Sequence, residues 1–368
     1  MNRKNNISLN QLESLIITSV IGVGILTVPS VAANILGNDG WLVILLGGLL
    51  AIPFIYIMNR LNRLYPGRIY YDFGKDIIGP YLFNVINFIY ACFFLIIVAF
   101  TVRVFAEAIK IFLLNDTPTE VIIITMLFTS SYIARNSIES LARMAVLILP
   151  IIIIITLLFT ILAIPAIDFT NILPLFKFNF GDLKNIFRGV GIVFFSYSGY
   201  EIMLIAMAYV GEGKKSVRYS IRAISYVIII YLVMFFVTLA EFGVYELKRE
   251  IWPSLSMMRE IELPGFFIEN VDGLILSAWV LVVFATIGPY LYSLSVILSK
   301  MFNTQKHNIF VLPAIPIIFV LSLIPQNLIE VYTYMEVISK YMGILVVAIF
   351  PTILYIIALI KRRREKCT

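Results

Sequence analysis

Two short glycine-centred sequences interrupt the first and sixth apolar runs of this chain. The first is Gly22-Val23-Gly24-Ile25-Leu26-Thr27-Val28-Pro29 and the second is Ser196-Tyr197-Ser198-Gly199-Tyr200-Glu201. A helix in lipid must keep its backbone N–H and C=O groups paired, so a break survives only where the freed groups face protein, water or a ligand. Breaks at corresponding positions of two halves predict a transporter-type binding site.

The residue types in both breaks suit a zwitterionic ligand. Glycine tolerates backbone angles that other residues resist, and Pro29 lacks the N–H that would bond the Ile25 carbonyl. The half-helix after Gly24 presents N–H groups and a positive dipole end, which suit a carboxylate. Exposed carbonyls near Ile21, Val23, Ser196 and Tyr197 suit an ammonium group or a cation. The predicted ligand-binding residues are Gly22, Val23, Gly24, Ile25, Ser196, Tyr197, Gly199 and Tyr200.

Three charged residues are candidates for proton transfer or gating. Twelve uncharged residues precede Glu201 and ten follow it, which places it near the middle of the membrane, where ionisable groups are costly and mostly functional. Arg103 and Glu107 are one helical turn apart and can form an ion pair. The alternatives are a hydrogen-bonded structural glutamate and an interfacial pair, just as the glycines and prolines alone could be kinks between packed helices. Small polar side chains of the eighth run, such as Thr286 and Tyr290, could also reach the site or join helices.

The composition predicts a membrane protein and argues against an enzyme. Of 368 residues, 61% are hydrophobic and 14% are charged, and the mean hydropathy is +0.97. The single histidine, His307, and two distant cysteines, Cys92 and Cys367, offer no metal-binding spacing, nucleophile–base pair or expected disulfide. We therefore expect no catalytic residue, no metal and no cofactor. The net charge of +6 is spread over loops, and we expect no nucleic-acid partner.

Uncharged runs predict an all-α polytopic protein with ten transmembrane helices. The first run is too long for a cleavable signal and contains Pro29. The predicted spans are Ser14–Asn38, Gly40–Asn59, Ile77–Val102, Val121–Ala134, Met144–Ile167, Gly189–Tyr200 continuing past Glu201 to Gly211, Ala223–Ala240, Gly273–Ser299, Asn308–Ile329 and Tyr341–Ile360.

Lysines and arginines set the expected orientation. With the N-terminus inside, nineteen lie in inner segments, six in outer segments and three near outer span ends, which satisfies the positive-inside rule. Both termini are then cytoplasmic. Two outer connections are long, about Asp168–Arg188 and Glu241–Asp272, and the second should lie on the membrane surface as an amphipathic or re-entrant element. The chain is predicted to be one transmembrane domain, 1–368, with halves of about 10–167 and 185–361, inverted relative to one another, and a basic cytoplasmic tail, 361–368.

Three stretches resemble one family. The first break resembles the amino acid–polyamine–organocation transporter superfamily, which has the leucine-transporter fold. The closer resemblance, over essentially the whole chain, is to the B subunit of bacterial spore germinant receptors, the endospore germination permease family. It rests on Gly22-Val23-Gly24-Ile25-Leu26 with Pro29 and Asp39-Gly40-Trp41; on Arg103, Ala106-Glu107, Phe112-Leu113-Leu114 and Thr117-Pro118; and most specifically on Ile251-Trp252-Pro253-Ser254, Ile261-Glu262-Leu263-Pro264-Gly265-Phe266-Phe267-Ile268-Glu269 and Trp279. Asn270 replaces the arginine that the family often has after that glutamate.

This resemblance implies five-plus-five inverted helices with discontinuous helices one and six. It also implies a nutrient sensor that binds a small germinant, commonly an amino acid or a nucleoside, within the lipid bilayer of the spore inner membrane. The implied partners are an A-type subunit and a C-type lipoprotein subunit. The residues themselves leave open a proton- or sodium-coupled amino acid permease, and a membrane scaffold whose site is vestigial.

Overall fold

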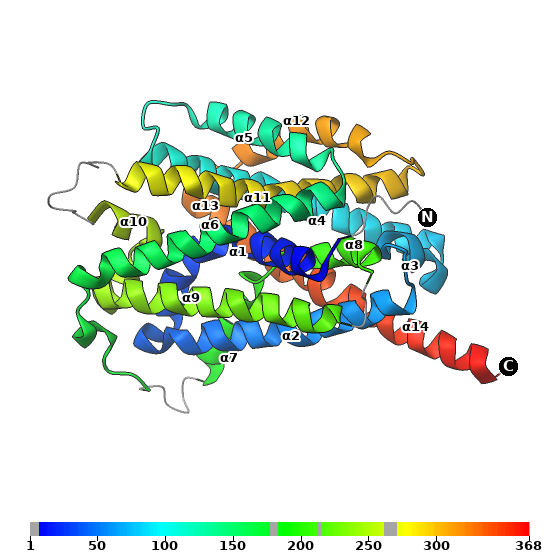
Figure 1. Cartoon of the computed structure of the whole chain (residues 1–368), viewed down its shortest axis with the longest axis horizontal. Coiled ribbons are helices and arrows are strands. Elements are labelled where there is room, and N and C mark those ends of the chain that lie inside the picture. Colours follow the sequence, from blue (N-terminus) through cyan, green and yellow to red (C-terminus); the bar gives the residue numbers. More distant parts are fainter. Residues whose placement is uncertain (1–6, 177–182, 212–214, 261–270, 368) are drawn as a thin grey trace.

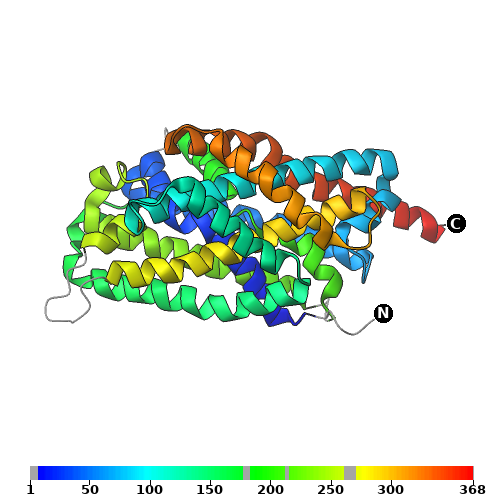
Figure 2. The same cartoon turned by 90° about the horizontal axis from the view of Figure 1, so that it is seen from above.

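The computed structural model describes residues 7–176, 183–211, 215–260 and 271–367, and these form an elongated helical bundle (Figures 1 and 2). The larger connection predicted to lie on the membrane surface falls partly outside these residues, as do Pro264, Phe266, Phe267 and Asn270. The α-helices are α1 (Leu9–Leu36), α2 (Trp41–Leu64), α3 (Tyr70–Ile78), α4 (Pro80–Phe112), α5 (Thr119–Ala134), α6 (Ile138–Ala163), α7 (Leu183–Phe195), α8 (Met203–Ala206), α9 (Ser216–Leu247), α10 (Pro253–Glu260), α11 (Val271–Met301), α12 (Val311–Leu323), α13 (Leu328–Ile338) and α14 (Phe350–Cys367).

Six helical stretches are long and apolar enough to span a membrane, within the described residues. One of them, Leu9–Leu64, contains both α1 and α2. The bent pair Leu183–Phe195 and Tyr200–Tyr209 passes the same test when taken together, and Thr119–Ala134 and Val311–Leu323 are shorter apolar helices. Counting α1 and α2 separately, the bent pair once and the two shorter helices gives the ten expected membrane helices. The chain is an all-α multi-pass membrane protein.

Helices at the same position in the two halves pack against one another. In the second half, α9, α11 and α12 are the counterparts of α2, α4 and α5, and each contacts its counterpart. The broken segment after Leu183 likewise packs against α1. The most extensive contact in the bundle joins α1 to α9. This pairing is the arrangement expected of a five-plus-five inverted repeat, in which two similar halves enclose a shared centre.

Local sequence explains where α1 begins and ends. Ser8 and Gln11 form a capping box, in which each side chain accepts a hydrogen bond from the other residue's backbone N–H. Gly37 ends the helix at a φ of 61°, a left-handed angle that glycine adopts without steric cost. Figure 1 places the start of α1 and the end of α14 toward the same end of the bundle, while α10 lies toward the opposite end.

The predicted boundary between spans nine and ten is wrong. The structure ends α12 at Leu323 rather than continuing to Ile329, and α13 begins at Leu328. Pro325 cannot donate a backbone hydrogen bond, and the Asn327 side chain accepts one from the Glu330 N–H as the cap of α13. Span ten therefore starts before Tyr341.

The third span also differs from its prediction at both ends. Ile77 belongs to the short helix α3, and α4 starts only after Gly79. At the other end α4 continues past Val102 to Phe112 and includes Arg103 and Glu107. The helix continues through both charged residues, whose side chains form an ion pair along it.

Candidate functional site

The first break is confined to one residue. Gly22 has φ −4° and ψ −112°, whereas the helix continues on both sides of it and Pro29 lies inside the second part. A Cβ placed on Gly22 would lie 2.7 Å from Cγ2 of Thr286, so α11 approaches the backbone here as closely as glycine permits. The sequence predicted a wider break, extending to Pro29.

The second break is longer. After α7 ends at Phe195, residues 196–199 form a turn, and the chain continues through short 3₁₀ and α-helical pieces as far as Tyr209. The two parts meet at an angle of 50°. Gly199 has a φ of +128°, which side-chain-bearing residues rarely adopt, so glycine is required by the backbone itself.

The structure brings the two breaks into direct contact. A Cβ on Gly199 would lie 2.5 Å from the carbonyl oxygen of Ser19 and 2.9 Å from Cα of Val20. On the other side, a Cβ on Gly24 would lie 3.1 Å from the carbonyl oxygen of Ser196. The two breaks therefore meet at one locus with backbone against backbone, and of the predicted site residues this contact brings Gly24 and Ser196 together.

Side-chain hydroxyls from three other helices bond the carbonyls of α1 around this locus. Thr286 of α11 donates to the Thr18 carbonyl (3.0 Å), and Ser254 of α10 donates to the Ile25 carbonyl (2.9 Å), which the proline at position 29 leaves without its helical partner. Tyr231 of α9 lies 3.2 Å from the Val20 carbonyl and 3.1 Å from the Ser196 carbonyl. These hydroxyls satisfy backbone groups that a broken helix exposes.

Sequence reasoning missed Tyr231 and Ser254. Each residue stands in a region whose local pattern gives no hint of a distant carbonyl partner. For Tyr231 the available signal was a polar group in an apolar run, which does not identify the helix that the group faces, and Ser254 falls in the connection Glu241–Asp272 that was expected on the membrane surface. Thr286 was noted only as a small polar side chain in span eight.

Glu201 caps the second break from inside. Its side chain accepts hydrogen bonds from the Ser198 hydroxyl (2.8 Å) and the Gly199 N–H (2.7 Å), and the residue is 1% exposed. Three buried tyrosines are close enough to interact electrostatically with this carboxyl group, namely Tyr71 of α3, Tyr90 of α4 and Tyr290 of α11. Within the described residues, no ion pair joins Glu201 to a basic side chain. The carboxyl group thus holds the turn in place through hydrogen bonds.

Two buried hydroxyls of the segments that meet at Gly199 have no partner within the described part of the chain. These are Oγ of Ser19, the residue whose carbonyl touches Gly199, and the phenolic oxygen of Tyr200. By contrast, the Tyr197 hydroxyl donates to the Ile44 carbonyl at 2.9 Å. A buried polar group without a partner costs about 1–3 kcal/mol, so Ser19 and Tyr200 are sites where a ligand or water can add a hydrogen bond.

The other two charged candidates lie elsewhere. The Nε of Arg103 is 2.9 Å from Oε1 of Glu107, and its Nη1 donates to the Ser322 carbonyl near the end of α12 at 3.1 Å. Both side chains are largely buried. These contacts tie α4 to the C-terminal end of α12, where a positive charge complements the helix dipole, and they include no residue of the breaks.

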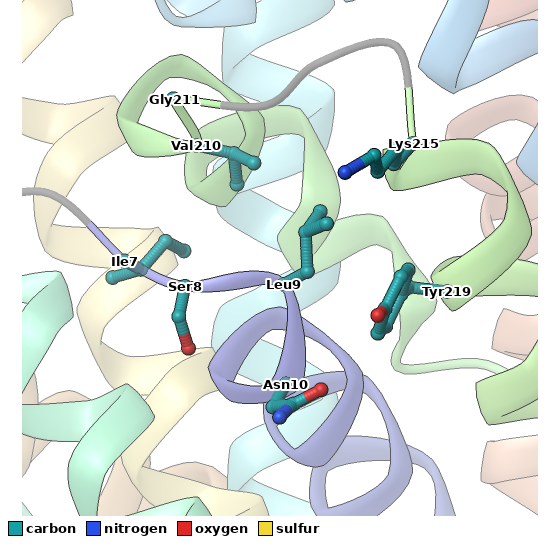
Figure 3. A pocket seen from close by; sticks show the side chains of 8 residues that line it. All are labelled: Ile7, Ser8, Leu9, Asn10, Val210, Gly211, Lys215 and Tyr219. Atoms are coloured by element: carbon teal, nitrogen blue, oxygen red, sulfur yellow. The ribbon is translucent and has the colours of Figure 1, made fainter.

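A separate cavity of about 510 Å³ lies beside the N-terminal end of α1, away from the break at Gly22 (Figure 3). It lies where Ile7 forms a backbone bridge with Val210. None of its lining residues was predicted from the sequence to bind the ligand. The lining is Ile7, Ser8, Leu9, Asn10, Val210, Gly211, Lys215 and Tyr219.

The chain resembles spore germination proteins over nearly its whole length. It is 29% identical to spore germination protein YndE of Bacillus subtilis (strain 168), covering 98% of this chain and 99% of that one. It is 28% identical to spore germination protein A2 of the same strain, over 95% of this chain and 94% of the relative. Spore germination protein GerLB of Bacillus cereus is 26% identical, over 94% and 92%.

Solved transporters share the fold. The structure of MhsT in complex with L-phenylalanine superposes with a TM-score of 0.67 at 12% identity, covering 95% of this chain and 97% of MhsT. A Na⁺-coupled sialic acid symporter gives the same TM-score at 14% identity, over 93% and 77%. The fold is thus the leucine-transporter fold. Because the family model described as spore germination protein also matches residues 6–331, the chain belongs to the spore germination protein family.

Proposed function

We propose that this protein is the nutrient-sensing membrane subunit of a spore germinant receptor. A small germinant of the amino acid or nucleoside class binds where the two breaks meet. Its binding changes the arrangement of the helices, and partner subunits respond to this conformational change. A ligand drives such a change only to the extent that it binds the two arrangements with unequal affinity.

The pair of unpartnered hydroxyls on Ser19 and Tyr200 carries the proposal. They stand in the segments that meet at Gly199, where Gly22, Gly24 and Gly199 all bring backbone close to other groups. A small ligand there gains hydrogen bonds that the protein alone does not make. The aromatic and aliphatic surroundings favour a small zwitterionic or uncharged molecule over a polyvalent one.

The proposed setting follows the family. The subunit lies in the spore inner membrane with both termini in the cytoplasm, as the distribution of lysine and arginine favours. It acts with an A-type subunit and a C-type lipoprotein subunit. The spore germination relatives support the membrane and the partners proposed here. The start of α1 and the end of α14 lie toward the same end of the bundle, which supports two termini on the same side of the membrane.

A proton- or sodium-coupled amino acid permease is the alternative, favoured by the transporter fold. The two functions differ in flux. Purified protein in vesicles that binds a nutrient without accumulating it supports the receptor, whereas saturable uptake that depends on an ion gradient supports the permease.

The test of the site uses Tyr200→Phe and Ser19→Ala. Each variant removes an unpartnered hydroxyl and so leaves the ligand-free protein as stable as before, or more stable. Spores carrying either variant should lose sensitivity to one nutrient of a panel of amino acids and nucleosides. Immunoblots check protein level, and a receptor-independent trigger checks that the spores can still germinate.

Ser130→Ala is the matched control, because Ser130 is an equally buried hydroxyl without a partner in the described chain and belongs to α5, which makes no extensive contact with α1 or α7. It should leave the nutrient response unchanged. If Tyr200→Phe and Ser19→Ala also leave it unchanged at normal protein levels, the locus is not the sensor and the scaffold alternative gains support.

A further inference from the structure

Three carbonyl oxygens converge on one side-chain hydroxyl at the centre of the bundle. The Tyr231 oxygen lies 3.2 Å from the Val20 carbonyl oxygen, 3.5 Å from that of Ile21 and 3.1 Å from that of Ser196. The first two belong to the break in α1 and the third to the turn after α7. Tyr231 is fully buried, and its ring packs on that of Tyr197 with 5.2 Å between centroids.

One hydroxyl cannot serve three acceptors at once. A tyrosine O–H carries a single hydrogen, so it donates to one carbonyl at a time while its lone pairs face the others. An ammonium group has three N–H donors and a positive charge, and it matches a triangle of carbonyls better. The carbonyl arrangement is thus better suited to a small cation than to the group that occupies it.

Gly24 leaves the space that this hydroxyl uses. A Cβ placed there would lie 2.1 Å from the Tyr231 oxygen and 2.7 Å from its Cζ. Glycine at this position therefore accommodates Tyr231, although the sequence suggested that it lines the ligand site directly. The hydroxyl stands between the two breaks and contacts both.

We propose that the Tyr231 hydroxyl is the resident occupant of the subsite for the germinant's amino group, and that an amine-bearing germinant must displace it. This inference rests on the proposed function for the identity of the ligand, but not for the chemistry of the subsite. Displacement of Tyr231 moves a side chain of α9, the helix with the most extensive contact to α1. Ligand binding is thereby coupled to the packing of the two helices.

The first experiment needs no germinant. Full-length wild-type protein and Tyr231→Phe are purified in detergent, and their melting temperatures are measured with increasing ammonium chloride. Removing the hydroxyl leaves room for about one heavy atom among the carbonyls. Ammonium should therefore raise the melting temperature of Tyr231→Phe by several degrees in a saturable way and leave the wild type unchanged. Tetramethylammonium chloride at equal ionic strength, too large for the space, should protect neither protein.

Tyr90→Phe is the matched control. It removes another fully buried tyrosine hydroxyl, which donates to the single carbonyl of Val346 at 2.8 Å. It should lose stability without being protected by ammonium. If Tyr231→Phe behaves in the same way, the hydroxyl is only a structural crosslink and the proposal is overturned. Tyr231→Leu provides a second variant for the same measurement if Tyr231→Phe does not fold.

Spores give the second readout. Because an amine no longer competes with the hydroxyl, Tyr231→Phe should lower the half-maximal concentration of an amino acid such as L-alanine by up to about tenfold. A nucleoside such as inosine, which has no ammonium group, should show no such shift. If no nutrient triggers even wild-type spores through this protein, the proposed function fails, whereas the ammonium measurement still decides the role of Tyr231.

Discussion

Thr286, Tyr231 and Ser254 come from three different helices, and each bonds a carbonyl of α1 through its hydroxyl. Hydroxyls suit this task in a membrane because they satisfy a freed carbonyl without carrying a charge into the bilayer. Glu201 performs the corresponding role at the second break, where the Gly199 N–H and the Ser198 hydroxyl both donate to it. The broken backbone is thus stabilised by side chains that also hold neighbouring helices in place.

Two glycines of the broken span, Gly199 and Gly191, differ in whether the structure leaves room for a side chain. Gly199→Ala should lower stability by about 2 kcal/mol or more, because its φ is unfavourable for alanine and the new Cβ meets the Ser19 backbone, which cannot rotate away. Gly191→Ala in α7 should be neutral or stabilising, since nothing lies within 4 Å of its Cβ position and alanine favours a helix. Thermal unfolding of both variants in detergent, followed by size-exclusion chromatography, tests this. Equal losses in the two variants would contradict the close contact between the breaks.

At the scale of elements, the sequence predicted the helices better than their ends. Long uncharged runs predicted the spans, including the short run Val121–Ala134, which lies in the helix Thr119–Ala134. The end of α12 was missed because a proline and an asparagine cap interrupt a run that still reads as apolar. Here local backbone chemistry outweighs hydropathy.

The site was predictable only in part, for a related reason. Gly22 and Gly199 stand in glycine-centred stretches of the first and sixth apolar runs, which correspond in the two halves, so the two loci could be found from the sequence. Tyr231 could not, because its partners Val20 and Ser196 lie 211 and 35 residues away. Only the packing of α9 against α1 brings these groups together, and that packing is set by shape along both helices.

The loop before α12 contains the single histidine of the chain, which makes its titration traceable. The Nε2 atom of His307 lies 3.1 Å from the Asn136 carbonyl in the loop between α5 and α6, and its ring packs on Tyr292. Burial lowers the pKa of His307 below its ordinary value, because imidazolium is disfavoured away from water, and this outweighs the hydrogen bonds. The folded protein therefore binds the proton less readily than the unfolded chain.

The sign of the pH effect follows from that shift. With the folded pKa depressed, the stability contributed by His307 is present above its unfolded pKa of about 6.5 and is lost as the pH falls toward the folded pKa. Wild-type protein should thus lose melting temperature between about pH 7 and pH 5. His307→Gln should lose less over the same range, and comparing the two removes the contribution of carboxylates. Parallel curves would show that His307 titrates as it does in the unfolded chain.

At the scale of the whole molecule, α9 holds α1 at two levels. Arg222 pairs with Glu13 in the half of α1 before the break, and Tyr231, nine residues further along α9, bonds at the break itself. Nine residues of helix span about 13.5 Å, so the two contacts lie at different depths. A movement of α9 at one of these contacts therefore also displaces α1 at the other contact. This helix pair can connect the site at the breaks to the end of the bundle that contains the cavity of Figure 3.

The ion pair gives that coupling a direct test. The Glu13 side chain is 7% exposed and that of Arg222 is 44% exposed, so losing the arginine leaves a carboxylate buried without its partner. Arg222→Gln should therefore destabilise the protein by about 1–2 kcal/mol, allowing for the exposure of the guanidinium. The charge-swapped double variant, Glu13→Arg with Arg222→Glu, should recover part of the loss if attraction between these side chains is the cause. If the double variant instead melts at a lower temperature than either Glu13→Arg or Arg222→Glu alone, the surroundings of Glu13 accept only a carboxylate. The coupling through α9 would then rest on Tyr231 alone.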